Sequence, residues 1–173
     1  MTMLELVKHL NFAVVVLFTL LYLYQGFYVV VGRARRRWQA RPQPSRLHRF
    51  AVIVSARNEE GVIGELLESL NRQNYPKELL DLYVVADNCT DNTADVVRSL
   101  GCHVVERHNL ELVGRGYALT YLLGHMLDIG VADDYEAYFV FDADNKLDKH
   151  YFEEMNKAFC SGFKILTSYR NSV

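Results

Sequence analysis

The sequence has 173 residues, half of them apolar, and a formal net charge of −2. A chain of this length holds one domain of about 120 residues and an additional segment, but hardly two independent cores. Seven of the 19 basic residues are arginines between positions 33 and 49, a stretch without Asp or Glu, so the rest of the chain carries 12 basic residues against 21 acidic ones. Such an acidic remainder argues against nucleic acid as a partner, because broad nucleic-acid binding depends on neutralising many phosphates.

An uncharged apolar run at residues 12–31 follows a short N-terminal segment, residues 1–11. A helix of this length matches the hydrocarbon core of a bilayer, about 30 Å, so we expect a transmembrane helix. A cleaved signal peptide is one alternative, but its apolar run is usually about 7–15 residues long and ends at a small-residue cleavage site. A buried helix of a soluble protein is the other, and such a helix is rarely apolar on every side.

The arginine-rich stretch at residues 32–49 comes directly after this run and reads as a short linker, because Pro42 and Pro44 prevent a continuous helix. By the positive-inside rule its charges place the C-terminal side of the chain in the cytoplasm. We therefore expect a plasma or inner membrane protein with a single N-terminal span and a cytoplasmic domain at residues 50–173. The cysteines of that domain show no metal-binding spacing and are expected to be reduced thiols.

Apolar strand patterns and helical patterns alternate through the domain. In chain order we expect a strand at 50–55, a helix at 61–71, a strand at 82–87, a helix at 93–100, a strand at 103–106, a helix at 117–129, a strand at 138–142, a helix at 149–159 and a strand at 164–168. Asp91 or Thr90 can cap the second helix, and Gly101 suits its C-terminal end. This alternation predicts an α/β fold with a mostly parallel sheet covered on both faces.

Polar residues follow nearly every expected strand, where ligands bind in open parallel sheets. The candidates are Ala56, Asn58 and Glu59 after the first strand, Asp87 and Asn88 after the second, Glu106 and Arg107 after the third, and Asp142, Asp144 and Asn145 after the fourth. A helix cap would explain Asp87 or Asn58 taken singly. It does not explain all four strand ends together.

Asp142 and Asp144 lie one residue apart at the end of an apolar strand, so both carboxylates can face one ligand. Two such oxygens suit Mg²⁺ or Mn²⁺, which keeps coordination sites for water and substrate phosphates. The cation would offset charge on a departing diphosphate. A solvated acidic loop is the alternative, and the position directly after a buried strand favours the metal site.

Asp87 and Arg115 are candidates for the two ends of a nucleotide. A carboxylate at a strand end can accept a hydrogen bond from an imide N–H such as that of uracil, with Asn88 beside it in the wall of the site. Arg115 stands between two glycines at an expected helix N-terminus, where amides and guanidinium both favour a diphosphate. A glycine turn with a solvated arginine is the alternative interpretation.

Four segments, taken together and in order, resemble the motifs of family-2 glycosyltransferases with the GT-A fold. They are Val52–Glu60 (VIVSARNEE), Val84–Thr93 (VVADNCTDNT), Gly114–Leu119 (GRGYAL) and Phe141–Asn145 (FDADN). Within that family the chain is most similar to the bacterial branch related to cellulose, chitin and poly-N-acetylglucosamine synthases. The resemblance extends from residue 50 to about residue 170.

The resemblance implies part of a GT-A domain with a Rossmann-like sheet, and the apolar run at residues 12–31 places a transmembrane helix before it. It implies transfer, with inversion, of a sugar from a nucleoside-diphosphate sugar, usually a UDP-sugar. The acceptor would be a glycan or a lipid-linked acceptor in cell-envelope or extracellular polysaccharide synthesis. The implied roles are nucleoside contacts for Ala56, Asn58 and Glu59, a base contact for Asp87, a place near the donor sugar and diphosphate for Asp142, and metal binding for Asp144. The family often has lysine where Arg115 stands, which changes the geometry of a phosphate contact.

Family members continue for roughly a hundred residues more and supply an acceptor-side aspartate as general base. The acidic residues after Asp144 are Asp148, Glu153 and Glu154; we expect the last two on the surface of a helix, and none of the three looks like the base. We therefore expect a truncated chain that holds the donor-binding half and transfers no sugar by itself. An inactive membrane-tethered nucleotide-sugar-binding remnant is the main alternative. A sugar-nucleotide pyrophosphorylase or a Rossmann dehydrogenase would need a glycine-rich loop after the first strand, which residues 57–61 do not form.

Overall fold

The computed structural model describes residues 2–38 and 44–168, in two compact units that divide between residues 41 and 42. The first unit is a single helix, α1 (Met3–Trp38), which extends beyond the predicted span at both ends. Among the described residues, one helical stretch, Met3–Arg35, is long and apolar enough by composition to cross a membrane, with a mean hydropathy of 2.1. Residues 39–43 of the expected linker and residues 169–173 of the expected domain lie outside the described residues.

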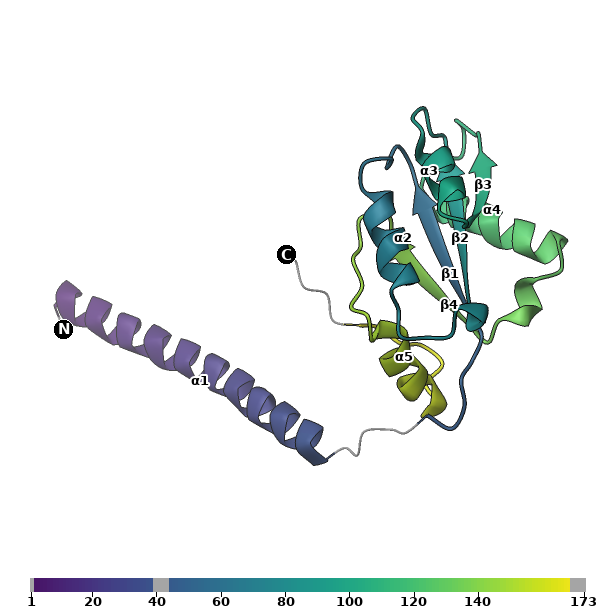
Figure 1. Ribbon diagram of the computed structural model, residues 1–173. Helices are drawn as coiled ribbons and strands as arrows, with labels where there is room; N and C mark the ends of the chain where they lie inside the picture. Colours follow the sequence, from purple (N-terminus) through teal and green to yellow (C-terminus); the bar gives the residue numbers. More distant parts are fainter. Residues whose placement is uncertain (1, 39–43, 169–173) are drawn as a thin grey trace. The chain divides into compact units, whose positions relative to one another are not determined.

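The second unit alternates strands and helices as the sequence predicts (Figure 1). Its main elements are β1 (Phe50–Ala56), α2 (Ile63–Asn71), β2 (Leu80–Asp87), α3 (Thr93–Ser99), β3 (His103–Arg107), α4 (Arg115–Asp128), β4 (Ala137–Asp142) and α5 (Tyr151–Cys160). Two short 3₁₀ turns, Lys77–Leu79 and Ala132–Asp134, precede β2 and β4. All eight predicted elements between residues 50 and 160 form, with ends that differ by a few residues.

The predicted strand at 164–168 is wrong, because these residues are irregular. A strand needs a neighbour to pair its backbone groups, and in the described part of the chain β4 pairs with β1 alone. Ile165 is 89% exposed, so the apolar side chains that indicated a strand are not buried either.

The sheet is entirely parallel and has the order β3-β2-β1-β4. The chain first builds β1, β2 and β3 in one direction and then crosses over to place β4 on the other side of β1. The strand order therefore reverses at β1. In open α/β sheets ligands bind at the carboxyl ends of the strands beside such a reversal.

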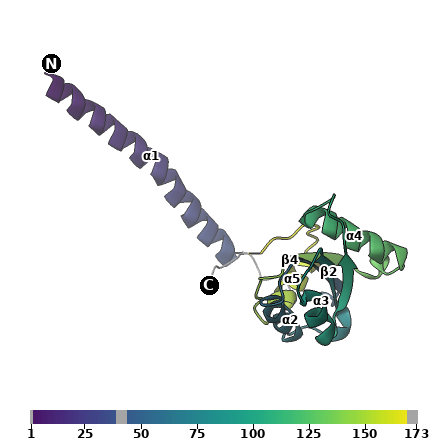
Figure 2. The ribbon, with the colours of Figure 1, turned by 90° about the horizontal axis from the view of Figure 1, so that it is seen from above.

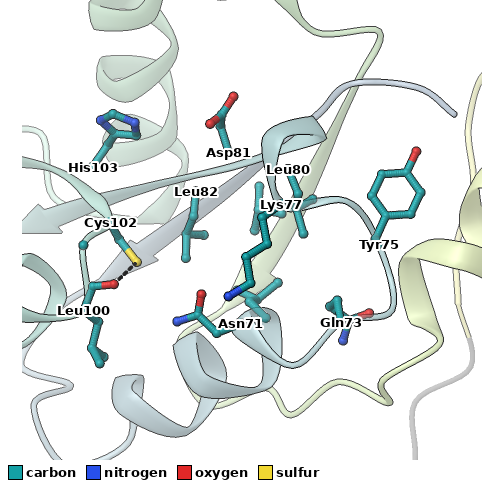
Figure 3. Close-up of a pocket in the computed structure, with 13 residues that line it drawn as sticks. Asn71, Gln73, Tyr75, Lys77, Leu80, Asp81, Leu82, Leu100, Cys102 and His103 are labelled. Atoms are coloured by element: carbon teal, nitrogen blue, oxygen red, sulfur yellow. Dashed lines mark hydrogen bonds between the residues drawn. The ribbon is translucent and has the colours of Figure 1, made fainter.

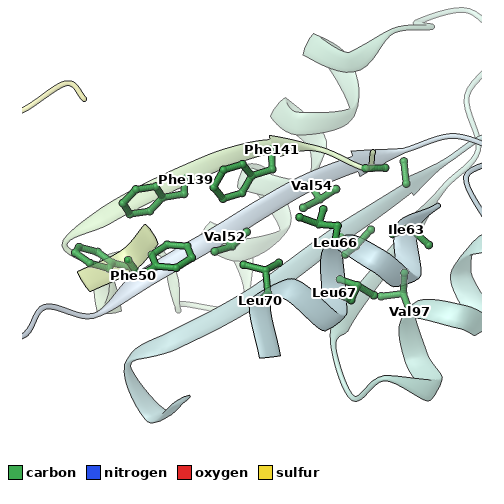
Figure 4. Packing of buried hydrophobic residues seen from close by; sticks show 14 of the residues in the cluster. Phe50, Val52, Val54, Ile63, Leu66, Leu67, Leu70, Val97, Phe139 and Phe141 are labelled. Carbon is green, nitrogen blue, oxygen red and sulfur yellow. The ribbon is translucent and has the colours of Figure 1, made fainter. Parts of the chain in front are cut away.

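Alternate residues of β1 are buried on opposite faces of the sheet, as the two-residue period of a strand requires. On one face Val52 and Val54 belong to a cluster with α2, α3 and α5 (Figure 4). On the other face Ile53 packs in a cluster with Leu122 and Met126 of α4. Figure 2 shows the result, with α4 on one side of the sheet and α2, α3 and α5 on the other. Helices thus cover both faces of β1 and β2. The expected cover on both faces is incomplete at β4, where Tyr138 and Val140, on the same face as Ile53, are exposed.

A group of three polar side chains links the amino ends of β1, β2 and β4: Arg49 before β1, Asp81 at the start of β2 and Tyr135 before β4. Arg49 Nη2 lies 2.8 Å from Asp81 Oδ2, and the Tyr135 hydroxyl donates to the same oxygen at 3.0 Å. Burial, with this bonding, raises the pKa of Tyr135 well above its ordinary value, so the phenol stays a donor. These contacts stabilise the end of the sheet opposite the predicted site.

Candidate functional site

The loops after β1 and β2 are joined through Asn58 and Thr90. Asn58 and Asn88 have positive φ angles of 57° and 53°, a conformation that asparagine tolerates better than most residues. Asn58 Oδ1 accepts hydrogen bonds from the Thr90 backbone N–H at 2.8 Å and from its hydroxyl at 3.3 Å. Asn58 is thus placed beside β2, while Ala56 is buried in the core.

Reciprocal contacts between Glu59–Glu60 and Asp91–Thr93 extend this connection. The Glu59 amide donates to Thr93 Oγ1 at 2.8 Å, and the Asn92 amide donates to Glu60 Oε2 at 2.9 Å. Asp91 accepts from the Thr93 hydroxyl at 2.6 Å and from the Thr93 amide at 3.1 Å, so it bonds the first residue of α3, while Asn92 holds the N-cap position. The hydroxyl bond lowers the pKa of the Asp91 carboxyl, so that carboxyl stays ionised.

Asp87 ends β2 in a buried ion pair with Arg107, which ends β3. Asp87 is 3% exposed and Arg107 5% exposed, and Arg107 Nη1 lies 2.5 Å from Asp87 Oδ1. Asn88 Nδ2 donates to the same oxygen at 3.2 Å and to the Asn109 carbonyl at 3.0 Å. Arg107 is the residue whose role the sequence interpretation missed. The parallel register places it directly opposite Asp87, and two neighbouring strands that end in opposite charges are the signal that predicts the pair.

Asp142 ends β4 and pairs with Arg115, the first residue of α4. Gly114 precedes this helix with φ 133°, a backbone conformation that side chains other than glycine rarely adopt. Arg115, at the start of α4, therefore contacts the first of the two paired carboxylates. Both side chains of the pair are partly exposed, at 46% for Arg115 and 33% for Asp142.

Asp144 is exposed two residues further along, and Asn145 Nδ2 donates to its Oδ1 at 3.0 Å. The described residues contain no group of three or more His, Cys, Asp or Glu side chains that could enclose a metal ion. Two carboxylates one residue apart nevertheless fit Mg²⁺ or Mn²⁺, because these cations commonly take one or two protein carboxylates and complete their shell with water and phosphate oxygens.

The described domain has a small cavity at one end of the sheet and a larger cleft along its edge strand β4. A cavity of about 170 Å³ lies at the amino ends of β2 and β3, lined by residues such as Lys77 and Cys102, and no predicted site residue reaches it (Figure 3). A cleft of about 1020 Å³ runs along β4 to Asp144 and Asn145. The larger cleft is thus continuous with the predicted metal carboxylate, whereas Asp87 and Arg115 lie outside its lining.

The predicted site residues therefore form three groups at the carboxyl ends of β2, β1 and β4. The base candidate Asp87 ends β2, and the phosphate candidate Arg115 pairs with the end of β4, so the two lie on either side of β1, where the strand order reverses. Glu153 and Glu154, in contrast, pair with Lys157 on the surface of α5, each at 2.8 Å, as predicted. Such a site can hold an elongated, negatively charged ligand with an N–H donor at one end.

A family model described as "Glycosyltransferase like family 2" matches residues 48–172, more than half of the chain. The chain is a member of glycosyltransferase family 2. This confirms the family that the four motifs indicate, and with it a transferase with an α/β domain of the GT-A type.

Solved structures of other glycosyltransferases share this fold. The glycosyltransferase TarS of S. aureus, solved as residues 1–349, is 26% identical with a TM-score of 0.52, over 66% of this chain and 32% of that one. The mannosyltransferase PcManGT of Pyrobaculum calidifontis, solved with GDP-Man and Mn²⁺, is 25% identical with a TM-score of 0.53, over 76% of this chain and 38% of that one.

A curated relative, the 4,4'-diaponeurosporenoate glycosyltransferase of Staphylococcus aureus, is 47% identical over 57 residues. That match covers 33% of this chain and 14% of the relative. This glycosyltransferase chain thus spans about a third of the solved chains and between 10% and 20% of the curated relatives it matches.

Proposed function

We propose that this chain forms the donor-binding part of an inverting glycosyltransferase that uses a nucleoside-diphosphate sugar, most simply a UDP-sugar. The observation that carries the proposal is the arrangement of four charged residues on both sides of the reversal at β1: Asp87 ends β2, Asp142 ends β4 and pairs with Arg115 at the start of α4, and Asp144 follows two residues later. TarS has been solved with UDP-GlcNAc bound, which supports a nucleotide sugar as the ligand of this fold.

Asp87 would recognise the base. A carboxylate is only an acceptor, so it favours a base that presents an N–H on its pairing edge. Uracil and guanine present one, whereas cytosine and adenine present a ring nitrogen acceptor at the equivalent position. Asn58, Glu59 and Asn88 would border the nucleoside from the two joined loops, with Ala56 beneath them.

Arg115 and the N-terminal amides of α4 would bind the diphosphate, since both favour anions. Asp144, with Asp142 beside it, would hold Mg²⁺ or Mn²⁺, and the cation would offset the charge that develops on the departing diphosphate. The Mn²⁺ bound in PcManGT supports a divalent metal in this fold. Asp142 would lie between the metal and Arg115, next to the donor sugar.

The remaining parts of the proposal concern the whole protein. The acceptor would be a glycan or a lipid-linked acceptor, and residues 12–31 would span the plasma or inner membrane with residues 32–49 as a cytoplasmic linker. The domain from residue 50 would hold the donor site. A membrane-tethered protein that binds the donor without turnover is the second candidate, because the described acidic residues after Asp144 include two that are paired on the surface of α5.

The test is calorimetric binding of UDP, GDP, CDP and ADP to the full chain in detergent with Mg²⁺. UDP or GDP should bind at least about tenfold more tightly than CDP or ADP. In CDP and ADP a ring nitrogen acceptor of the base would face the Asp87 carboxylate, which is itself an acceptor, and no hydrogen bond could form. Asp87→Asn should remove that preference. An equal affinity for all four nucleotides, or no binding of any, would refute the proposed role of Asp87.

A further inference from the structure

Arg107 has no proposed contact with the donor, yet its side chain is only 5% exposed and its guanidinium is bonded on two sides. Nη1 reaches Asp87 Oδ1 at 2.5 Å, and Nη2 donates to the Leu112 carbonyl at 2.7 Å. The guanidinium carbon also lies 5.9 Å from the ring centre of Tyr121 on α4. One side chain therefore contacts the end of β2, the loop before α4 and α4 itself.

The two oxygens of Asp87 differ in their surroundings. Oδ1 receives hydrogen bonds from both Arg107 and Asn88. In the part of the chain that the structure describes, no protein donor bonds to Oδ2. Every fully buried side-chain oxygen there has a hydrogen-bond partner, so Oδ2, which has none, is not fully buried and reaches solvent. The pair with Arg107 thus fixes the carboxylate in one orientation and leaves its second oxygen for a ligand.

We infer that Arg107 is a positioning residue for base selection, and this inference rests on the proposed function. Arg107 holds Asp87 so that Oδ2 accepts from the base N–H, and its bond to Leu112 holds the loop that leads to Arg115. A buried ion pair gives little net stability over an apolar pair of similar size, because removing both charges from water is costly. Its presence at the strand end that faces the base is therefore better explained by orientation than by stability.

A double-mutant cycle in the full chain tests this inference, with UDP and CDP as probes. Arg107→Met should weaken UDP binding about tenfold and lower the UDP-to-CDP affinity ratio by a similar factor. In the Asp87→Asn background the same change should alter UDP affinity by less than about twofold, because Arg107 acts through Asp87. Arg107→Lys, which keeps the charge but cannot make both bonds at once, should restore part of the ratio.

Arg49→Met provides the matched control, because it breaks another arginine–aspartate pair at the opposite end of the sheet. It should leave the UDP-to-CDP ratio unchanged. An unchanged ratio in Arg107→Met and Arg107→Lys, or an equal loss of UDP affinity with and without Asp87, would show a structural role only and overturn the inference. Failure of the wild-type chain to bind either nucleotide would overturn the proposed function, and this inference with it.

Discussion

Arg115 and Asp142 bring opposite charges together at the point where the diphosphate is expected. Because both side chains are partly exposed, water screens their attraction, and the pair contributes little stability by itself. A guanidinium in this position can exchange the carboxylate for phosphate oxygens, with which it makes similar charge-assisted hydrogen bonds. At the scale of single residues, the proposal thus assigns this pair to the phosphate end of the donor site.

Arg115→Ala should weaken UDP binding about tenfold and leave uridine binding within about twofold, because only UDP carries the diphosphate. Calorimetry with both ligands measures the difference. Arg98→Ala is the control, since Arg98 pairs with Asp95 and Glu106 on the surface. Equal losses for UDP and uridine would mean that Arg115 does not contact the phosphates.

At the scale of elements, the hydrogen-bonded loops after β1 and β2 form one unit, and Asn58 holds it together. Asn58→Ala loses two hydrogen bonds to Thr90 and places a less tolerant residue at φ 57°. We expect a loss of about 1–3 kcal/mol in the free energy of unfolding. Asn58→Gly relieves the backbone cost and should lose less. Denaturant unfolding of both variants measures this, and an Ala variant as stable as the wild type would show that the loops do not depend on Asn58.

The helices and strands between residues 50 and 160 could be predicted because their apolar periodicity matches the faces they bury. Leu66, Leu67 and Leu70 lie on one face of α2, and all three are buried against the sheet. The strand expected at 164–168 fails because a strand also depends on a pairing partner, which its own residues do not specify. The periodicity of a segment therefore predicts a strand correctly only where another strand is available to pair with it.

Within the site, strand-end positions could be predicted from polarity, whereas the partners of each side chain could not. The sequence allows Asp87 to be either a helix cap or a base contact. Only the register of β2 and β3 shows that Arg107 lies opposite it. The pairing of Arg115 with Asp142 likewise depends on the fold, which brings the first residue of α4 to the carboxyl end of β4. Such contacts depend on how the strands and helices are arranged in space, which no single motif predicts.

At the scale of the whole molecule, the positive charges after residue 31 predict the orientation of the chain. Reporter fusions at residue 60 should give a cytoplasmic signal, and a tag at the N-terminus should be accessible from outside. Replacing the arginines at 33, 35, 36 and 37 by glutamine should reduce this bias, because positive charge next to the span retains that side in the cytoplasm. A periplasmic signal from the fusion at residue 60 would contradict the proposed topology.

Metal-dependent UDP binding tests the central claim most directly. Calorimetry on the full chain should show UDP binding about tenfold tighter with Mn²⁺ than with chelator, because Asp144 would hold the cation and the cation would offset the charge of the diphosphate. Asp144→Ala should remove the difference, while Asp128→Ala, which changes an exposed carboxylate at the end of α4, should preserve it. Equal affinity of the wild-type chain for UDP with and without metal would contradict the proposed donor site.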